Sequence, residues 1–174
     1  MNSTKLLSTV RSLSLATAAL VVGAGVSLAA MDPPAPKVDC SAAENAGKQA
    51  CAPQSHDDKV YESAYWKAKN GDYAGALEMA ASAENTNDPR ILRVTGYATR
   101  KLGDVDGGMK YYQRALAINP ADTRTRQYMG EAFLTKRDLV SATTQLGEIA
   151  KICGNCEDYQ KLADAISDYK TKGL

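Results

Sequence analysis

Four cysteines are the residues best suited to chemistry in this chain of 174 residues: Cys40, Cys51, Cys153 and Cys156. The last two enclose the motif Cys153-Gly154-Asn155-Cys156. Two thiols at this spacing can form a disulfide, act as a redox dithiol, or supply half of a tetrahedral zinc site. Attachment of c-type haem is excluded, because Glu157 stands where that motif requires histidine.

A structural disulfide is the interpretation that the surrounding sequence favours. A thioredoxin-like centre needs a strand followed by a helix, whereas the pattern here predicts helices alone. A zinc site would have to recruit Cys40 and Cys51, or His56, from the far end of the chain. We therefore expect disulfides between Cys153 and Cys156 and between Cys40 and Cys51, and no metal or cofactor. Thiol-redox or metal handling remains the alternative.

Side chains for acid–base or nucleophilic catalysis are scarce. His56 is the single histidine, and the sequence contains no Ser/His/Asp or Cys/His set and no phosphate-binding loop. We therefore expect a protein that is not an enzyme and has no catalytic residues.

Residues 1–29 have the pattern of a signal peptide. Lys5 and Arg11 precede an uncharged run, Leu13–Val26, which ends in the small residues of Ser27-Leu28-Ala29-Ala30. An uncleaved anchor is the alternative, because a run of this length can just span a bilayer. We expect cleavage and a periplasmic or secreted protein, a location that favours disulfides. Removing two positive charges changes the net charge from +1 to −1, so we expect neither nucleic acid nor membrane as partner.

The chain after the predicted cleavage site changes character twice. Residues 30–56 form an arm that begins with Pro33, Pro34 and Pro36 and contains Cys40 and Cys51. Because proline blocks helix and favours extended backbone, we expect no packed structure at its start. From residue 57 onward the pattern is helical.

Pairs of amphipathic stretches repeat along residues 57–156. Three corners separate the two stretches of each pair: Gly71-Asp72, Gly103-Asp104 and Arg137-Asp138. A period of about 34 residues with two helices per unit predicts a solenoid. The first stretches are Asp57–Lys69, Arg90–Lys101 and Thr123–Lys136, and the second are Tyr73–Glu84, Val105–Ile118 and Leu139–Ile152.

The middle unit resembles a tetratricopeptide repeat. The residues that carry the likeness are Gly96-Tyr97-Ala98, Lys101-Leu102-Gly103-Asp104 and the run from Arg114 to Pro120. Small residues at Gly96 and Gly130, and at Ala76, Gly108 and Ala142, match positions where the family packs its two helices closely. The resemblance implies an all-α tetratricopeptide-repeat solenoid of three helix pairs, 57–88, 89–122 and 123–156. Residues 157–174 would form a capping helix and a tail.

The closing stretch Cys-Gly-Asn-Cys-Glu-Asp-Tyr, together with Gly-Tyr-Ala-Thr-Arg-Lys, is similar to exported tetratricopeptide proteins of alphaproteobacteria. That likeness implies location and fold rather than a mechanism.

The tetratricopeptide resemblance also implies a concave groove, lined by the first helix of each repeat, that binds a protein or peptide. Its centre would be basic, which favours an acidic or C-terminal segment. The alternative is a solvated helix face on which tyrosine packs under arginine. We therefore predict a periplasmic scaffold for protein–protein interaction, and the sequence leaves its oligomeric state open. The predicted binding residues are Tyr61, Tyr65, Arg90, Arg93, Tyr97, Arg100, Lys101, Arg124, Gln127 and Glu131.

Overall fold

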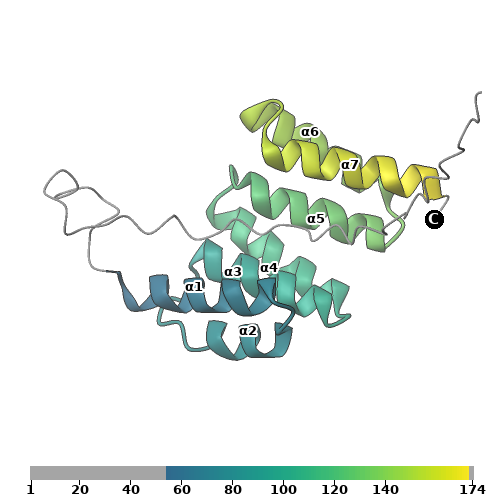
Figure 1. The fold of residues 1–174 in the computed structure, drawn as a ribbon. Coiled ribbons are helices and arrows are strands. Elements are labelled where there is room, and N and C mark those ends of the chain that lie inside the picture. Colours follow the sequence, from purple (N-terminus) through teal and green to yellow (C-terminus); the bar gives the residue numbers. More distant parts are fainter. Residues whose placement is uncertain (1–53, 173–174) are drawn as a thin grey trace, which may run out of the picture.

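The computed structural model describes residues 54–172, which form seven helices and no strand (Figure 1). The predicted signal peptide, most of the arm, Cys40 and Cys51 lie outside this range. The helices are α1 (His56–Lys69), α2 (Tyr73–Ala80), α3 (Pro89–Lys101), α4 (Val105–Ile118), α5 (Thr123–Thr135), α6 (Leu139–Cys153) and α7 (Glu157–Lys172).

The helices stack in pairs, from α1 and α2 at one end of the molecule to α5 and α6, and α7 packs on the last pair (Figure 1). The predicted all-α solenoid with a capping helix is therefore confirmed. No helix within residues 54–172 has both the length and the apolar character to cross a bilayer.

The same backbone conformation makes the corner inside each pair. Gly71, Gly103 and Arg137 have φ values of 86°, 104° and 62°, the left-handed region that ends a helix. In each corner an aspartate follows, and its carboxylate accepts a hydrogen bond from the backbone of the next helix. Arg137 adopts this conformation without the freedom of glycine, which costs about 1 kcal/mol.

Helix α2 is shorter than the sequence predicted, since it ends at Ala80 and not at Glu84. The Asp57 carboxylate accepts hydrogen bonds from the backbone N–H groups of Glu84 and Asn85, at 2.8 and 2.9 Å. These bonds draw the chain away from the helix axis and fix the connection to α3.

Close packing of α3 on α4 depends on two glycines. A Cβ atom on Gly96 would lie 2.7 Å from Tyr112 Cε1, and one on Gly108 would lie 2.7 Å from the carbonyl oxygen of Gly96. Gly130, which was predicted to allow close packing of the two helices in its own pair, has a different role. Gly130 receives Leu162 of α7, whose Cδ2 would lie 2.5 Å from an added Cβ, so this glycine seats the capping helix.

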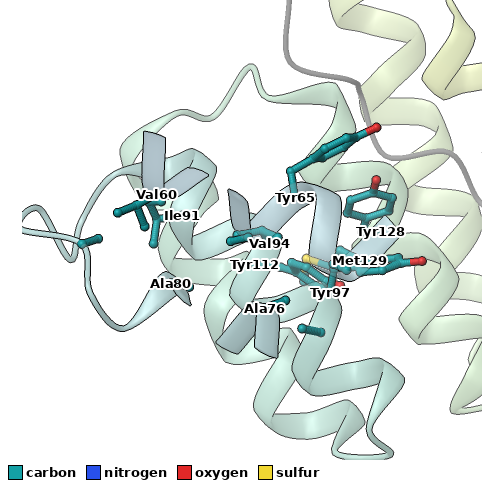
Figure 2. Close-up of a cluster of buried hydrophobic side chains, with 14 of the residues drawn as sticks. Val60, Tyr65, Ala76, Ala80, Ile91, Val94, Tyr97, Tyr112, Tyr128 and Met129 are labelled. Atoms are coloured by element: carbon teal, nitrogen blue, oxygen red, sulfur yellow. The ribbon is translucent and has the colours of Figure 1, made fainter. Parts of the chain in front are cut away.

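Tyrosine fills much of the core (Figure 2). Tyr112 and Tyr128 are fully buried, and their ring centroids lie 6.2 Å apart. Tyr97 packs on Tyr128 with a centroid distance of 5.2 Å. The rings thereby join α3, α4 and α5.

The capping helix α7 has an apolar side that packs on α5 and α6. Leu162 is fully buried and Ile166 nearly so. At its start, the Asp158 carboxylate pairs with Arg124 of α5 and accepts a hydrogen bond from the Thr123 hydroxyl at 2.6 Å.

Candidate functional site

The ten predicted binding residues lie on α1, α3 and α5, whereas the cysteine pair Cys153 and Cys156 lies at the junction of α6 and α7. We call these ten residues the first-helix face. Ion pairs between consecutive first helices organise this face, and the sequence did not predict them. Arg90, Arg93 and Arg100 each pair with a carboxylate of a neighbouring first helix. That carboxylate belongs either to the helix itself or to the N-cap residue of that helix.

Arg90 ties α3 to α1. Its guanidinium lies 2.7 Å from the Asp58 carboxylate and 2.6 Å from that of Asp88, the N-cap of its own helix. Hydrogen bonds from Arg90, and then from Ser55, lower the pKa of Asp58. Burial alone would raise the pKa of Asp88, but its hydrogen bonds from Arg90 outweigh burial and lower it.

Arg93 ties α3 to the beginning of α5. It pairs with the Asp122 carboxylate at 2.8 Å, and the two side chains are 13% and 8% exposed. It also donates a hydrogen bond to the Tyr61 hydroxyl at 3.3 Å. The Tyr61 ring lies near two guanidinium carbons, 5.4 Å from that of Arg90 and 6.0 Å from that of Arg93. These contacts hold the ring in place.

Arg100 pairs with Glu131 of α5 at 2.9 Å. Burial works to lower the pKa of Arg100, but the neighbouring Tyr112 and Glu131 raise it overall. Glu131 also accepts a hydrogen bond from Gln127. The Glu131 carboxylate is therefore bound by one side chain of α3 and by one of its own helix, α5. These contacts fix the position of α3 along α5.

The first-helix face is less basic than the sequence predicted. Arg93 and Arg100 each have one carboxylate partner, and Arg90 and Arg124 have two each. Lys101 makes no ion pair within the described residues. Burial and the nearby Arg100 lower its pKa, and its Nζ lies 5.5 Å from the centroid of the Tyr97 ring.

Only part of the first-helix face is open to solvent. Lys101 is exposed, and Tyr61 and Arg90 are half-buried. Four predicted members are buried and offer little contact area: Tyr65, Tyr97, Arg124 and Gln127. Burial raises the pKa of Tyr97 to about 12. The packing of tyrosine against arginine, which was the alternative interpretation, is present at Tyr61 and Tyr97. Binding at this face stays a prediction.

The carboxylates were the functional side chains missed by sequence reasoning. Asp58, Asp122 and Glu131 lie between 29 and 32 positions from their arginines. This separation is close to the repeat length. A search of the sequence for opposite charges one repeat apart would therefore have predicted these ion pairs.

The Cys153–Cys156 disulfide is present. It joins the last residue of α6 to the residue before α7, with a Cα–Cα distance of 5.7 Å. The disulfide lies at the corner between α6 and α7, far along the chain from α1 and α3. Within residues 54–172 no cluster of three or more His, Cys, Asp or Glu side chains is arranged to hold a metal ion.

Comparison with known proteins shows that the fold is similar to that of a bacterial chaperone. No family model and no curated protein sequence matches the chain. The type III secretion chaperone SycD of Yersinia enterocolitica, in complex with a peptide of the translocator YopD, superposes with a TM-score of 0.57. The match has 18% identity and covers 69% of this chain and 98% of SycD.

Two further SycD structures agree with this result. One matches with a TM-score of 0.58 over 70% of this chain and 89% of SycD. The other, an alternative dimer of SycD, matches with a TM-score of 0.59 over 68% of this chain and 96% of the SycD chain. Both are 18% identical to this chain. At that identity the likeness establishes a shared helical-repeat fold.

Proposed function

We propose that this chain is an exported, non-enzymatic scaffold that binds a segment of another protein on its first-helix face. The observation that carries the proposal is the half-exposed Tyr61 ring, held between two arginines that carboxylates already fix. Peptide binding by SycD, which has the same fold, supports it.

Pre-organisation is the physical reason for choosing this surface. A side chain that is free before binding must lose rotamer freedom, at about 0.5–1.5 kcal/mol for each one ordered. Arg90 and Arg93 make their ion pairs within the chain and position Tyr61 before any partner arrives. Tyrosine then offers a rigid apolar area with a polar tip, which suits a binding anchor.

The ion pairs also define the chemistry of the partner. A strongly acidic peptide would have to displace carboxylates that are already bound to the arginines, so we do not favour it. Lys101 is exposed and makes no ion pair within residues 54–172, so a single carboxylate of a partner can reach it. We propose an extended segment with an apolar side chain that packs on Tyr61 and one acidic group, or a terminal carboxylate, near Lys101.

Export is part of the proposal. The pattern of residues 1–29 supports it, and so does the Cys153–Cys156 disulfide, because disulfides persist in oxidising compartments. The intact mass of the protein from the cell envelope tests it. Cleavage predicts a chain that begins at residue 30 or 31 and lacks two hydrogens for each disulfide.

Thiol-redox activity is a second candidate, and the solvent exposure of Cys153 is the observation in its favour. It predicts that the Cys153–Cys156 disulfide exchanges readily with glutathione and that the protein catalyses reduction of a disulfide substrate. The scaffold proposal predicts that the protein shows no such catalysis.

Substitutions at exposed positions test the scaffold. Partners captured from envelope extract by the wild-type protein should be lost with Tyr61→Ala and weakened with Lys101→Glu. Lys110→Glu is the matched control, because it makes the same charge change at an exposed site of α4. Equal loss with all three variants, or with none, would argue against the first-helix face.

A further inference from the structure

The open part of the first-helix face extends from Tyr61 to Lys101. Arg90 pairs with Asp58 and Arg93 binds Tyr61, and each contact joins residues 32 positions apart. Because the two separations are equal, α1 and α3 run in the same direction. Lys101 follows Arg93 by eight residues, which is about 12 Å along α3. An occupant of this face therefore needs an apolar group and a carboxylate about 12 Å apart.

The chain itself contains a segment of this description. Residues 31–40, which we call the proline segment, have the sequence Met-Asp-Pro-Pro-Ala-Pro-Lys-Val-Asp-Cys and lie outside the described residues. Proline favours extended backbone of the polyproline type, which advances about 3.1 Å per residue. Pro36 and Asp32 are four residues apart, so about 12 Å separates them in such a conformation.

We propose that the proline segment binds the first-helix face of its own chain, with Pro36 on the Tyr61 ring and Asp32 beside Lys101. The segment thereby competes with a partner, which must displace it in order to bind. This inference rests on the proposed function, because it adds an internal competitor at the same surface.

The connection between the proline segment and the fold is long enough for this contact. Residues 41–53 join the segment to Gln54, the first described residue, which precedes α1. Thirteen residues span at most about 45 Å. Tyr61 lies only about 8 Å along α1 from His56, and α3 is about 10 Å away from α1. A Cys40–Cys51 disulfide would shorten the connection but still allow the contact, because it holds its two Cα atoms about 6 Å apart.

Charge complementarity favours the proline segment as the occupant. The arginines of the face already have carboxylate partners, whereas Lys101 makes no ion pair within residues 54–172. The proline segment contains Asp32, Asp39 and Lys37, so its net charge is −1. One surplus carboxylate thus meets one available cation, and no ion pair of the face has to break.

The prolines suit the Tyr61 ring, which is half-buried and held beside the guanidinium groups of Arg90 and Arg93. Proline-rich segments bind aromatic surfaces with a small loss of conformational freedom, because their backbone is already restricted. The covalent connection also gives the segment an effective concentration of about a millimolar at the face. A contact that is weak between separate molecules therefore forms within one chain.

Photo-crosslinking of the full protein, purified from the cell envelope, tests the contact. A photoreactive phenylalanine analogue in place of Tyr61 should crosslink to residues 31–40, and the analogue in place of Gln113, exposed on α4, should not. A mixture of unlabelled and nitrogen-15-labelled protein shows whether both crosslinked peptides come from one chain. Asp32→Lys and Lys101→Asp should each lower the yield about two- to fivefold, and the two changes together should restore it.

Loss of the prolines should make the face available. A synthetic peptide of residues 31–39 should bind the full-length variant Pro33→Ser/Pro36→Ser about tenfold more tightly than the wild type. This is the ratio expected when the segment occupies the face in nine of ten wild-type molecules. Pro53→Ser is the matched control, because it removes a proline of the same arm outside the proline segment. It should bind the peptide as the wild type does.

Two crosslinking results would overturn the inference: no crosslink from position 61 to residues 31–40, or crosslinks between different chains alone. Equal peptide affinity of the wild type and the double proline variant would also overturn it. In each case capture of another protein at position 61 in cells would still support the proposed function. A crosslink to residues 31–40, with no partner captured even by the double proline variant, would support the arm contact and refute the proposed function.

Discussion

The Arg93 guanidinium of α3 pairs at 2.8 Å with the Asp122 carboxylate, which is also the N-cap of α5. One side chain thus both begins a helix and fastens it to the first helix of the preceding pair. Asp122 binds the backbone N–H and the hydroxyl of Thr125 as well, at 3.0 and 2.7 Å. This arrangement makes the spacing between α3 and α5 depend on a small number of charged contacts.

Asp122→Asn removes the charge and keeps a side chain that can cap α5. Because Arg93 would then lack its carboxylate in a mostly buried site, we expect a loss of about 2–3 kcal/mol in the free energy of unfolding, measured with urea. Asp106→Asn is the matched control, since it breaks the solvent-exposed pair of Asp106 with Lys136. Similar losses for the two variants would contradict the role given to the buried pair.

Acid should weaken the solenoid in a defined pH range. The pKa values of Asp58 and Asp88 are lowered in the folded protein. A lowered pKa contributes stability that is complete above the unfolded value of about 3.9 and is lost as the pH falls through the folded value. We expect these groups to add no pH dependence between pH 5 and 7, and a decline in stability below about pH 4. Asp88→Asn should flatten that decline in urea unfolding measured between pH 2.5 and 7. An unchanged slope would refute the assignment.

Two glycines in helices should respond in opposite ways to alanine. Gly96→Ala places a methyl group 2.7 Å from Tyr112 Cε1, and overpacking of this kind costs about 1–3 kcal/mol. Gly147→Ala meets no atom within 4 Å and should stabilise α6 by about 0.5–1 kcal/mol, because alanine favours helix. Thermal and urea unfolding give both values. If Gly96→Ala left stability unchanged, the close approach of α3 and α4 would be in doubt.

The disulfide at the corner before α7 should act locally. Cys156→Ser should speed amide hydrogen exchange in α7 about three- to tenfold and leave α1–α4 unchanged, because the bridge constrains only the α6–α7 corner. Wild-type protein under reducing conditions should show the same increase in α7. An exchange rate in α7 that ignores both treatments would show that packing of Leu162 and Ile166 holds the helix without the bridge.

The fold followed from the sequence because its signals are local and repeated. Corners such as Gly71-Asp72 and Gly103-Asp104 mark helix ends through backbone conformation alone, and apolar periodicity marks the helices between them. The end of α2 did not follow, because it depends on Asp57, a side chain of another helix, which binds the backbone at Glu84 and Asn85.

The character of the candidate site was harder to predict than the fold. Arginines at groove positions indicated a basic surface, but a single helix does not show which charges its neighbours carry. Asp122 and Glu131 neutralise Arg93 and Arg100 across the interface between α3 and α5. Pairing therefore sets the charge of the face, and pairing depends on how the repeats stack.

The central claim, that a partner binds at the first-helix face, is tested most directly by photo-crosslinking in living cells. A photoreactive phenylalanine analogue in place of Tyr61 should crosslink to a specific partner, and mass spectrometry should map the contact to one segment of it. The same analogue in place of Gln113, exposed on α4, should not capture that partner. A partner captured at position 61 alone is the predicted result. Absence of a crosslink at position 61, or equal capture at both positions, would contradict it.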